Sequence, residues 1–161
     1  MDLKVETEGS ILRITLCRGE AGNALTPAMT EGIAAAVSAP PADATVIVIA
    51  AEGPDFCTGR APVMPPRDAR LTANDLRSRI SDPVLAFYAA LRGAPVPVVA
   101  RVQGRAAGVG CALAALADVA VADSGALFSV PEMGHDIAPT LVMDALVDRL
   151  PRAALARLVL T

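Results

Sequence analysis

Two glycine-containing turns are the part of this sequence best suited to chemistry on a carbonyl group. One turn covers residues 56–60 and follows an apolar, β-branched run at 45–51; the other covers residues 104–110 and follows a second such run at 96–102. The second turn leads into a predicted helix, whose first N–H groups and dipole favour negative charge. Two such turns facing each other could direct two N–H donors at one oxygen atom and form an oxyanion hole. Two ordinary tight turns would give the same pattern, so the turns alone leave both interpretations open.

The second turn also contains half of a dinucleotide-binding fingerprint. Gly108 and Gly110 match the first two glycines of G-x-G-x-x-G, but Leu113 stands where the third glycine is required. The helix predicted after the turn is also short. Both departures argue against a dinucleotide bound at this turn.

A hydrolytic site would need His135, which is the only histidine in the chain. Ser129 with His135 and Asp136, or Cys111 with His135, could form one, because such groups are assembled in space rather than in sequence. No recognisable nucleophile motif surrounds Ser129 or Cys111. A polar loop residue is therefore the favoured interpretation of His135.

The elements that must position the turns alternate between strand and helix. A hairpin is predicted from residues 2–7 and 10–17, and buried strands from 45–51, 96–102 and 118–122. Helices are predicted from Thr26-Pro27 to Pro40-Pro41, over 74–92 in two pieces joined at Asp82-Pro83, over 111–117 and 141–146, and from Pro151 onward. This alternation predicts an α/β fold.

Composition excludes several functional classes. The chain has 161 residues, enough for one domain; 53% are hydrophobic and 19% charged, which excludes disorder over the chain as a whole. A net charge of -3 and four aromatic residues give neither a basic surface nor a stacking platform for nucleic acid.

The cysteines and the apolar runs indicate a cellular compartment. Cys17, Cys57 and Cys111 are odd in number and far apart, so neither a disulfide framework nor a zinc site of the C-x-x-C kind is expected. The start of the sequence has no signal-peptide pattern, and the longest near-apolar run, 106–117, is shorter than the ~20 residues of a membrane helix. We therefore expect a soluble cytoplasmic protein with no membrane partner.

Short motifs in a fixed order cover nearly the whole chain. They are ITLCR at 14–18, NAL at 23–25, VIVI at 46–49, FCTGR at 56–60, PVVA at 97–100, GRAAGVGC at 104–111, AD at 117–118 and FSVPEMG at 128–134. In this order and spacing they resemble the enoyl-CoA hydratase/isomerase (crotonase) family.

The resemblance implies an α/β fold of the ClpP/crotonase type, a spiral of repeated ββα units that binds acyl-CoA thioesters. Residues 1–161 would form a single N-terminal core domain with both the acyl-CoA site and the catalytic site. Family members continue into a helical C-terminal region that closes the acyl pocket and builds trimers or hexamers. That region is absent here, so the chain is either truncated or naturally short. A complete chain of this length would expose an apolar face at Leu155, Leu158 and Val159.

The resemblance also implies which residues carry the chemistry. The backbone N–H groups of Arg60 and Val109 would hold the thioester oxygen, although members usually have glycine in place of Val109, and valine adds bulk and resists positive φ. Of the two glutamates that activate water in hydratases, only the second is present, as Glu132. Ala112 stands at the position of the first, and Asp136 is a substitute that the motif does not support.

One carboxylate is enough to move a proton between two carbon atoms, so the resemblance favours double-bond isomerisation over hydration. The CoA half of the substrate would bind at Arg18, Ala24, Cys57, Thr58, Gly59 and Gly108. Arg18 could equally be a solvated surface charge. No metal is expected, and no cofactor other than the coenzyme A of the substrate. The alternatives are an enoyl-CoA hydratase and a non-catalytic acyl-CoA-binding or assembly subunit.

Overall fold

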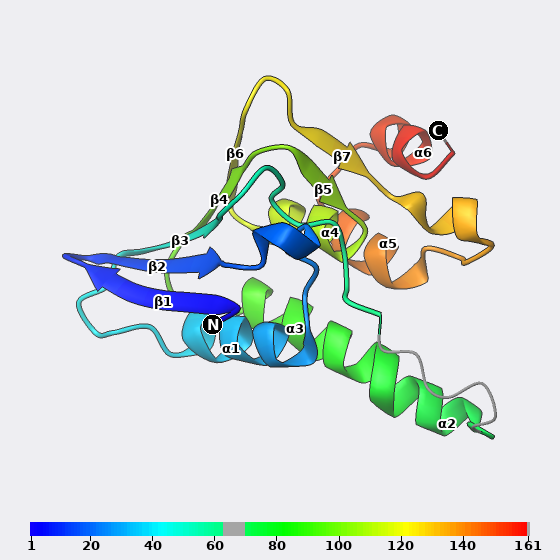
Figure 1. The fold of residues 1–161 in the computed structure, drawn as a ribbon, viewed down its shortest axis with the longest axis horizontal. Helices are drawn as coiled ribbons and strands as arrows, with labels where there is room; N and C mark the ends of the chain where they lie inside the picture. Colours follow the sequence, from blue (N-terminus) through cyan, green and yellow to red (C-terminus); the bar gives the residue numbers. More distant parts are fainter. Residues whose placement is uncertain (63–69, 161) are drawn as a thin grey trace.

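The computed structural model describes residues 1–62 and 70–160, which form two sheets and the helices that pack against them (Figure 1). The larger sheet has the strand order β1 (Leu3–Glu8), β2 (Ile11–Leu16), β3 (Val46–Ala51), β4 (Val98–Val102), β6 (Val119–Ala122). The smaller sheet pairs β5 (Arg105–Ala107) with β7 (Leu127–Ser129) in parallel. The helices are α1 (Pro27–Ser38), α2 (Ala73–Leu76), α3 (Asp82–Arg92), α4 (Val109–Leu116), α5 (Thr140–Leu146) and α6 (Arg152–Leu160), with short turns η1 (Gly19–Ala21), η2 (Arg77–Ser81) and η3 (Pro131–His135).

The chain repeats one pattern of connections. In the larger sheet, β1 and β2 pair antiparallel, and β2, β3, β4 and β6 pair parallel with their neighbours in that order. After each of β2, β3 and β4 the chain forms a short extended segment and then a helix before it returns to the larger sheet, and after β6 it forms β7 and then the last helices. This confirms the predicted α/β fold, the N-terminal hairpin and the repeated ββα organisation.

Helix α1 begins where its predicted capping residue and first-turn proline place it. Thr26 caps it through its side chain, which accepts a hydrogen bond from the N–H of Met29 at 3.2 Å, and Pro27 occupies the first helical position. Met29, Ile33 and Val37 are buried on its inner face. Figure 1 shows α1 and α3 side by side beneath the larger sheet.

The prediction of two helical pieces joined at Asp82-Pro83 is confirmed, since α3 begins at Asp82 directly after η2. The chain remains helical from α2 through η2 into α3, and η2 is a π turn in which the N–H of Asp82 bonds to the carbonyl of Arg77. Pro83 has no N–H to donate, and the widened turn just before it lets the helix continue.

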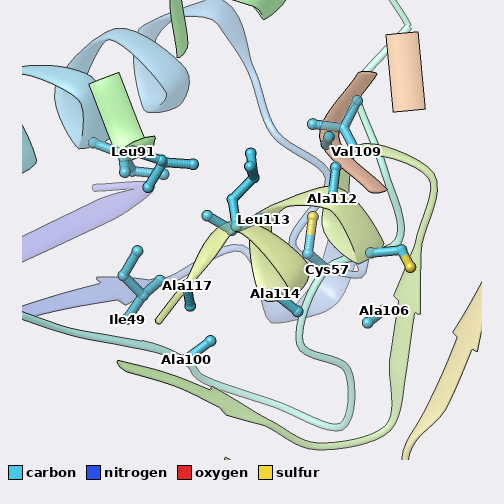
Figure 2. Close-up of a cluster of buried hydrophobic side chains, with 14 of the residues drawn as sticks. Ile49, Cys57, Leu91, Ala100, Ala106, Val109, Ala112, Leu113, Ala114 and Ala117 are labelled. Atoms are coloured by element: carbon cyan, nitrogen blue, oxygen red, sulfur yellow. The ribbon is translucent and has the colours of Figure 1, made fainter. Parts of the chain in front are cut away.

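The segment 104–110 contains more regular secondary structure than the sequence predicted. It includes β5, and α4 begins at Val109 rather than at residue 111. The segment after β3 packs tightly against it. A β-carbon on Gly110 would overlap the carbonyl oxygen of Cys57, so only glycine fits there. Figure 2 shows Cys57 beside Ala112 on α4, and the run of alanines on this helix permits the close packing.

The prediction of an exposed apolar face on the last helix is wrong. Leu155 is buried, and Leu158 and Val159 are partly buried against the core, because α6 packs on β7 and η3. Large exposed apolar side chains lie instead on β6 and β7, where Val121 is 56% and Leu127 66% exposed.

All three cysteines are free thiols, as predicted, and Cys57 and Cys111 are buried. Within the described ranges, no helix is both long and apolar enough to cross a membrane.

A polar cluster, which we call the loop clamp (Asn23, Asp55 and Arg105), joins the connections that follow β2, β3 and β4. Asn23 is 0% exposed; its Nδ2 donates to the carbonyls of Glu52 and Asp55 at 2.8 Å each, and its Oδ1 accepts from the N–H of Arg18 at 2.8 Å. Asp55 accepts two hydrogen bonds from the Arg105 guanidinium at 3.0 and 2.6 Å and one from its N–H at 2.9 Å. The clamp therefore fixes three connections relative to one another.

The loop clamp leads us to expect that two ion pairs of similar geometry contribute very differently to the free energy of unfolding. Asp55→Asn should lower the free energy of unfolding by about 1.5–3 kcal/mol, because it removes the charge from a carboxylate that is only 10% exposed. Glu8→Gln is the matched control. Glu8 also binds one arginine, Arg13, through two hydrogen bonds, but it is 54% exposed and should lose less than about 1 kcal/mol. Urea unfolding measures both, and equal losses would contradict the structural role of the clamp.

The stabilisation that the Asp55 carboxylate provides should depend on pH. Hydrogen bonds from Arg105 hold the pKa of Asp55 below its ordinary value of 3.8, so the folded state favours the charged carboxylate. The stabilisation is therefore present above pH 3.8 and is lost as the pH falls through the lowered pKa. The difference in unfolding free energy between the wild type and Asp55→Asn should be large at pH 7 and shrink in acid. A difference that is constant over this range would contradict the expectation.

Candidate active site

The candidate site lies where four short segments run parallel to one another. Residues 22–25 follow β2, residues 57–61 follow β3, β5 follows β4, and β7 follows β6. A parallel bridge joins Cys57 to Ala106, and another at Leu25 joins the first segment to the second. Because the segments are parallel, the C-terminal ends of all four lie at the same edge of this group of segments.

This arrangement brings the two predicted oxyanion donors to neighbouring positions. Gly59 lies against β5, since a β-carbon on it would be 3.5 Å from the carbonyl oxygen of Ala107. Arg60 is the next residue of its segment, and Val109 follows the end of β5 by two residues. Neither N–H donates a hydrogen bond to any residue that the structure describes. Both are therefore available as donors, and their convergence on one oxygen atom stays a prediction.

Valine at position 109 causes no backbone strain. The positive φ of this turn, +53°, falls on Gly108, and Val109 begins α4 with ordinary helical geometry. The departure from the glycine usual in the family therefore leaves the N–H in place.

Glu132 lies directly beside this turn. It follows β7 in η3, after the buried residue Val130. A β-carbon on Gly108 would lie 2.9 Å from Glu132 Oε1, so the carboxylate occupies the space that glycine leaves open. The other oxygen, Oε2, is buried and has no hydrogen-bond partner among the described residues. Glu132 and Val109 are thus close neighbours, as the sequence-based hypothesis requires, while the role of Glu132 stays a prediction.

The position of the missing carboxylate is fully buried. Ala112 is 0% exposed on α4, and Figure 2 shows it near Val109. Asp136, considered as a substitute, is exposed at the end of η3. Exposure to water makes it a poor replacement for a carboxylate enclosed in the site.

The hydrolytic alternatives gain no support from the structure. Ser129 and His135 are exposed, and no hydrogen bond in the described part of the chain joins either of them to Asp136. Burial, with a smaller contribution from the charge of Glu132, raises the pKa of the Cys111 thiol to about 11, which opposes formation of the reactive thiolate. The same described ranges contain no group of three His, Cys, Asp or Glu residues that could hold a metal ion.

Several side chains assigned to the CoA half serve the protein itself. Arg18 Nη1 donates to the carbonyl of Ala24 at 2.8 Å, and its Nε lies 3.4 Å from Asp2. The Thr58 hydroxyl donates to the carbonyl of Gly22 at 3.0 Å. Burial raises the pKa of the Cys57 thiol to about 11. Contact of these residues with CoA stays a prediction.

Two open hollows lie at the carboxyl ends of β2, β3 and β4. Glu52 and Gly53 line both of them, with Arg105 in one and Arg101 in the other. Neither hollow includes Glu132, and the one lined by Gly22 and Arg105 lies at the N-terminal ends of two of the four segments.

Tyr88 is a residue that sequence reasoning missed. It lies on α3 with its hydroxyl buried and, within the described ranges, without a hydrogen-bond partner. Burial and then the charge of Glu132 raise the pKa of Tyr88. The signal in the sequence was the only tyrosine of the chain on the apolar face of a helix, where phenylalanine would pack equally well.

The chain is similar in sequence to known proteins along almost its whole length. A family model described as Enoyl-CoA hydratase/isomerase matches residues 6–161. The 2,3-dehydroadipyl-CoA hydratase of Escherichia coli (strain K12) is 33% identical over 141 residues, covering 86% of this chain and 52% of the relative. Enoyl-CoA hydratase domain-containing protein 3, mitochondrial, of Homo sapiens is 31% identical over 157 residues, covering 94% of this chain and 50% of the relative.

A solved structure agrees with these relatives. The crystal structure of enoyl-CoA hydratase from Mycobacterium smegmatis matches with a TM-score of 0.86 at 28% identity, covering 100% of this chain and 63% of that one. The chain therefore spans about half the length of the curated relatives it matches.

The contact between Gly108 and Glu132 can be tested without a substrate. Gly108→Ala should lower the free energy of unfolding by about 1–3 kcal/mol, because alanine is strained at a φ of +53° and its β-carbon would press on Glu132 Oε1. Gly134→Ala is the control: it lies two residues beyond Glu132, and its β-carbon would meet nothing within 4 Å. Chemical denaturation measures both, and equal stability of the two variants would contradict the described turn.

Proposed function

This chain is a member of the enoyl-CoA hydratase/isomerase family, and we propose that it acts on acyl-CoA thioesters by stabilising an enolate between Arg60, Val109 and Glu132. The observation that supports this proposal most directly is the contact of the Glu132 carboxylate with the glycine turn that precedes the Val109 N–H. A proton acceptor and a free N–H donor next to each other are what formation of an enolate requires.

The backbone donors would act on the thioester oxygen. When a proton leaves the carbon next to the carbonyl, negative charge develops on that oxygen, and two fixed N–H groups stabilise the charge without having to reorganise. One such donor typically changes the rate about 100- to 1,000-fold. The position of Val109 at the start of α4 adds the favourable end of the helix dipole.

Glu132 would move the proton. Acting alone, it takes a proton from C2 of a 3-enoyl thioester and returns it to C4, so that the double bond moves to the 2-enoyl position. Ala112 offers no second carboxylate to activate water, which favours isomerisation as the main reaction. Hydration is the second candidate, because the E. coli relative is named as a hydratase.

The remaining parts of the proposal follow from the family. The substrate brings coenzyme A, held in part by the segments that contain Arg18, Ala24 and residues 57–59, and no metal or redox cofactor takes part. Assembly into a trimer or hexamer and a cytoplasmic location stay predictions; the human relative is named as mitochondrial.

Removal of the Glu132 carboxylate tests the proposal. Glu132→Gln should lower turnover of a 3-enoyl-CoA about 100- to 10,000-fold, because the amide cannot accept the proton, while binding of the CoA ester is retained. Asp136→Asn, at the exposed end of η3, is the matched control and should leave turnover unchanged. Stopped assays with 2-enoyl-CoA and 3-enoyl-CoA, with products separated by chromatography and mass, give the rates.

Two outcomes would contradict the proposal. Equal turnover by the wild type and Glu132→Gln would show that the Glu132 carboxylate takes no part in the reaction. Binding of the CoA ester without any turnover in the wild type would favour the alternative of a non-catalytic acyl-CoA-binding or assembly subunit.

A further inference from the structure

The segment that carries the Arg60 N–H is bound along one side by residues 22–25. The N–H of Leu25 donates to the carbonyl of Gly59 at 2.8 Å, and the N–H of Ala61 donates to the carbonyl of Leu25 at 2.8 Å. The carbonyl of Gly59 and the N–H of Arg60 belong to the same trans peptide unit. These two groups point in opposite directions, so the bond from Leu25 directs the Arg60 N–H away from residues 22–25.

The glycine in front of this donor makes its direction depend on the neighbouring bonds. Gly59 has a φ of +119°, a region that glycine enters freely, and it restrains the flanking peptide units less than any other residue would. On the side before Gly59, Thr58 supplies the restraint. The N–H and the hydroxyl of Thr58 both donate to the carbonyl of Gly22, at 2.9 and 3.0 Å.

The Thr58 side chain lies directly against Gly22. A β-carbon on Gly22 would be 2.7 Å from Thr58 Oγ1 and 2.8 Å from its Cγ2, so the threonine occupies the space that this glycine leaves open. The hydroxyl has one proton, which it donates to the carbonyl of Gly22. It therefore has no proton left to donate to an oxygen atom of CoA.

The point to which Thr58 binds is itself fixed. Gly22 precedes Asn23, whose buried side chain belongs to the loop clamp. Asn23 binds the carbonyls of Glu52 and Asp55, which precede Thr58 in the connection after β3. The Thr58 hydroxyl thus holds the later part of this connection to a segment that the earlier part already fixes.

We propose that Thr58 is a positioning residue for the oxyanion donor: its hydroxyl holds the connection after β3 on the carbonyl of Gly22 and so keeps the Arg60 N–H directed at the thioester oxygen. The hydroxyl then acts on the rate of enolate formation and not on the affinity for CoA. This inference rests on the proposed function, because it requires the Arg60 N–H to stabilise the enolate. It goes beyond the family resemblance, which implies only contact of Thr58 with CoA.

The test separates enolate formation from binding. Thr58→Val removes the hydroxyl and keeps the shape of the side chain, whereas Thr58→Ser keeps a hydroxyl. Thr30→Val is the matched control, because the Thr30 hydroxyl also donates to a backbone carbonyl, that of Pro27 at 2.8 Å, but on α1. Butyryl-CoA is the probe: exchange of its C2 protons in deuterated water gives the rate at saturation, and a titration gives its Kd.

The expected result is a loss of rate without a loss of affinity. Thr58→Val should exchange C2 protons about tenfold more slowly than the wild type at saturating butyryl-CoA, since a displaced donor loses part of the ~100- to 1,000-fold effect of one donor. Its Kd for butyryl-CoA should stay within about twofold of the wild-type value. Thr58→Ser should recover most of the rate, and Thr30→Val should keep the wild-type rate.

Four results would overturn the inference. They are an unchanged rate at saturation in Thr58→Val, a Kd that rises as much as the rate falls, the same loss of rate in Thr58→Ser, and the same loss in Thr30→Val. An unchanged rate with a raised Kd would make Thr58 a CoA contact instead. All four leave the proposed function standing. A wild type that binds butyryl-CoA without exchange would overturn the proposed function, and the inference with it.

Discussion

The close approach of Cys57 to Gly110 is the constraint on which the rest of the site depends. The carbonyl of Cys57 lies where a side chain at position 110 would have to lie, so the connection after β3 and the start of α4 can meet only through glycine. The bridge between Cys57 and Ala106 fixes the register of the two segments. From that register it follows that Arg60 and Val109 are neighbours at one end of the segments. The loop clamp then holds the same connections from the other end.

Polar groups in this protein fall into two kinds. Asn23 and Asp55 are buried and fully paired, and they fix the geometry of the connections. Three buried oxygen atoms are unpaired within the residues described, namely Tyr88 Oη, Gln103 Oε1 and Glu132 Oε2, and Glu132 belongs to the candidate site. Paired groups stabilise the fold, whereas unpaired groups oppose folding and are usually retained for function.

Much of the fold followed from local patterns. Thr26 and Pro27 marked the start of α1, and the β-branched run at 45–51 predicted a buried strand, because capping and burial are properties of a few neighbouring residues. Strands β5 and β7 were not predicted, since three-residue strands exist only through pairing with distant segments. The junction of two helical pieces at Asp82-Pro83 was predicted from the proline, whereas the π turn that precedes it was not.

The site was only partly predictable, because it too depends on pairing between segments that are distant in the sequence. The glycine turns and Glu132 could be read from motifs, but the contact of Glu132 with Gly108 is a product of the paired segments. Tyr88 carries no motif, and only the folded structure shows that its buried hydroxyl has no hydrogen-bond partner among the described residues.

Exchange of the C2 protons of a saturated acyl-CoA in deuterated water tests the central claim most directly, since exchange requires an enolate but neither a double bond nor added water. The account predicts that the wild type incorporates deuterium at C2, measured by mass, and that Glu132→Gln binds the same ester without incorporation. An acyl-CoA that binds to the wild type and incorporates no deuterium would contradict enolate formation at this site.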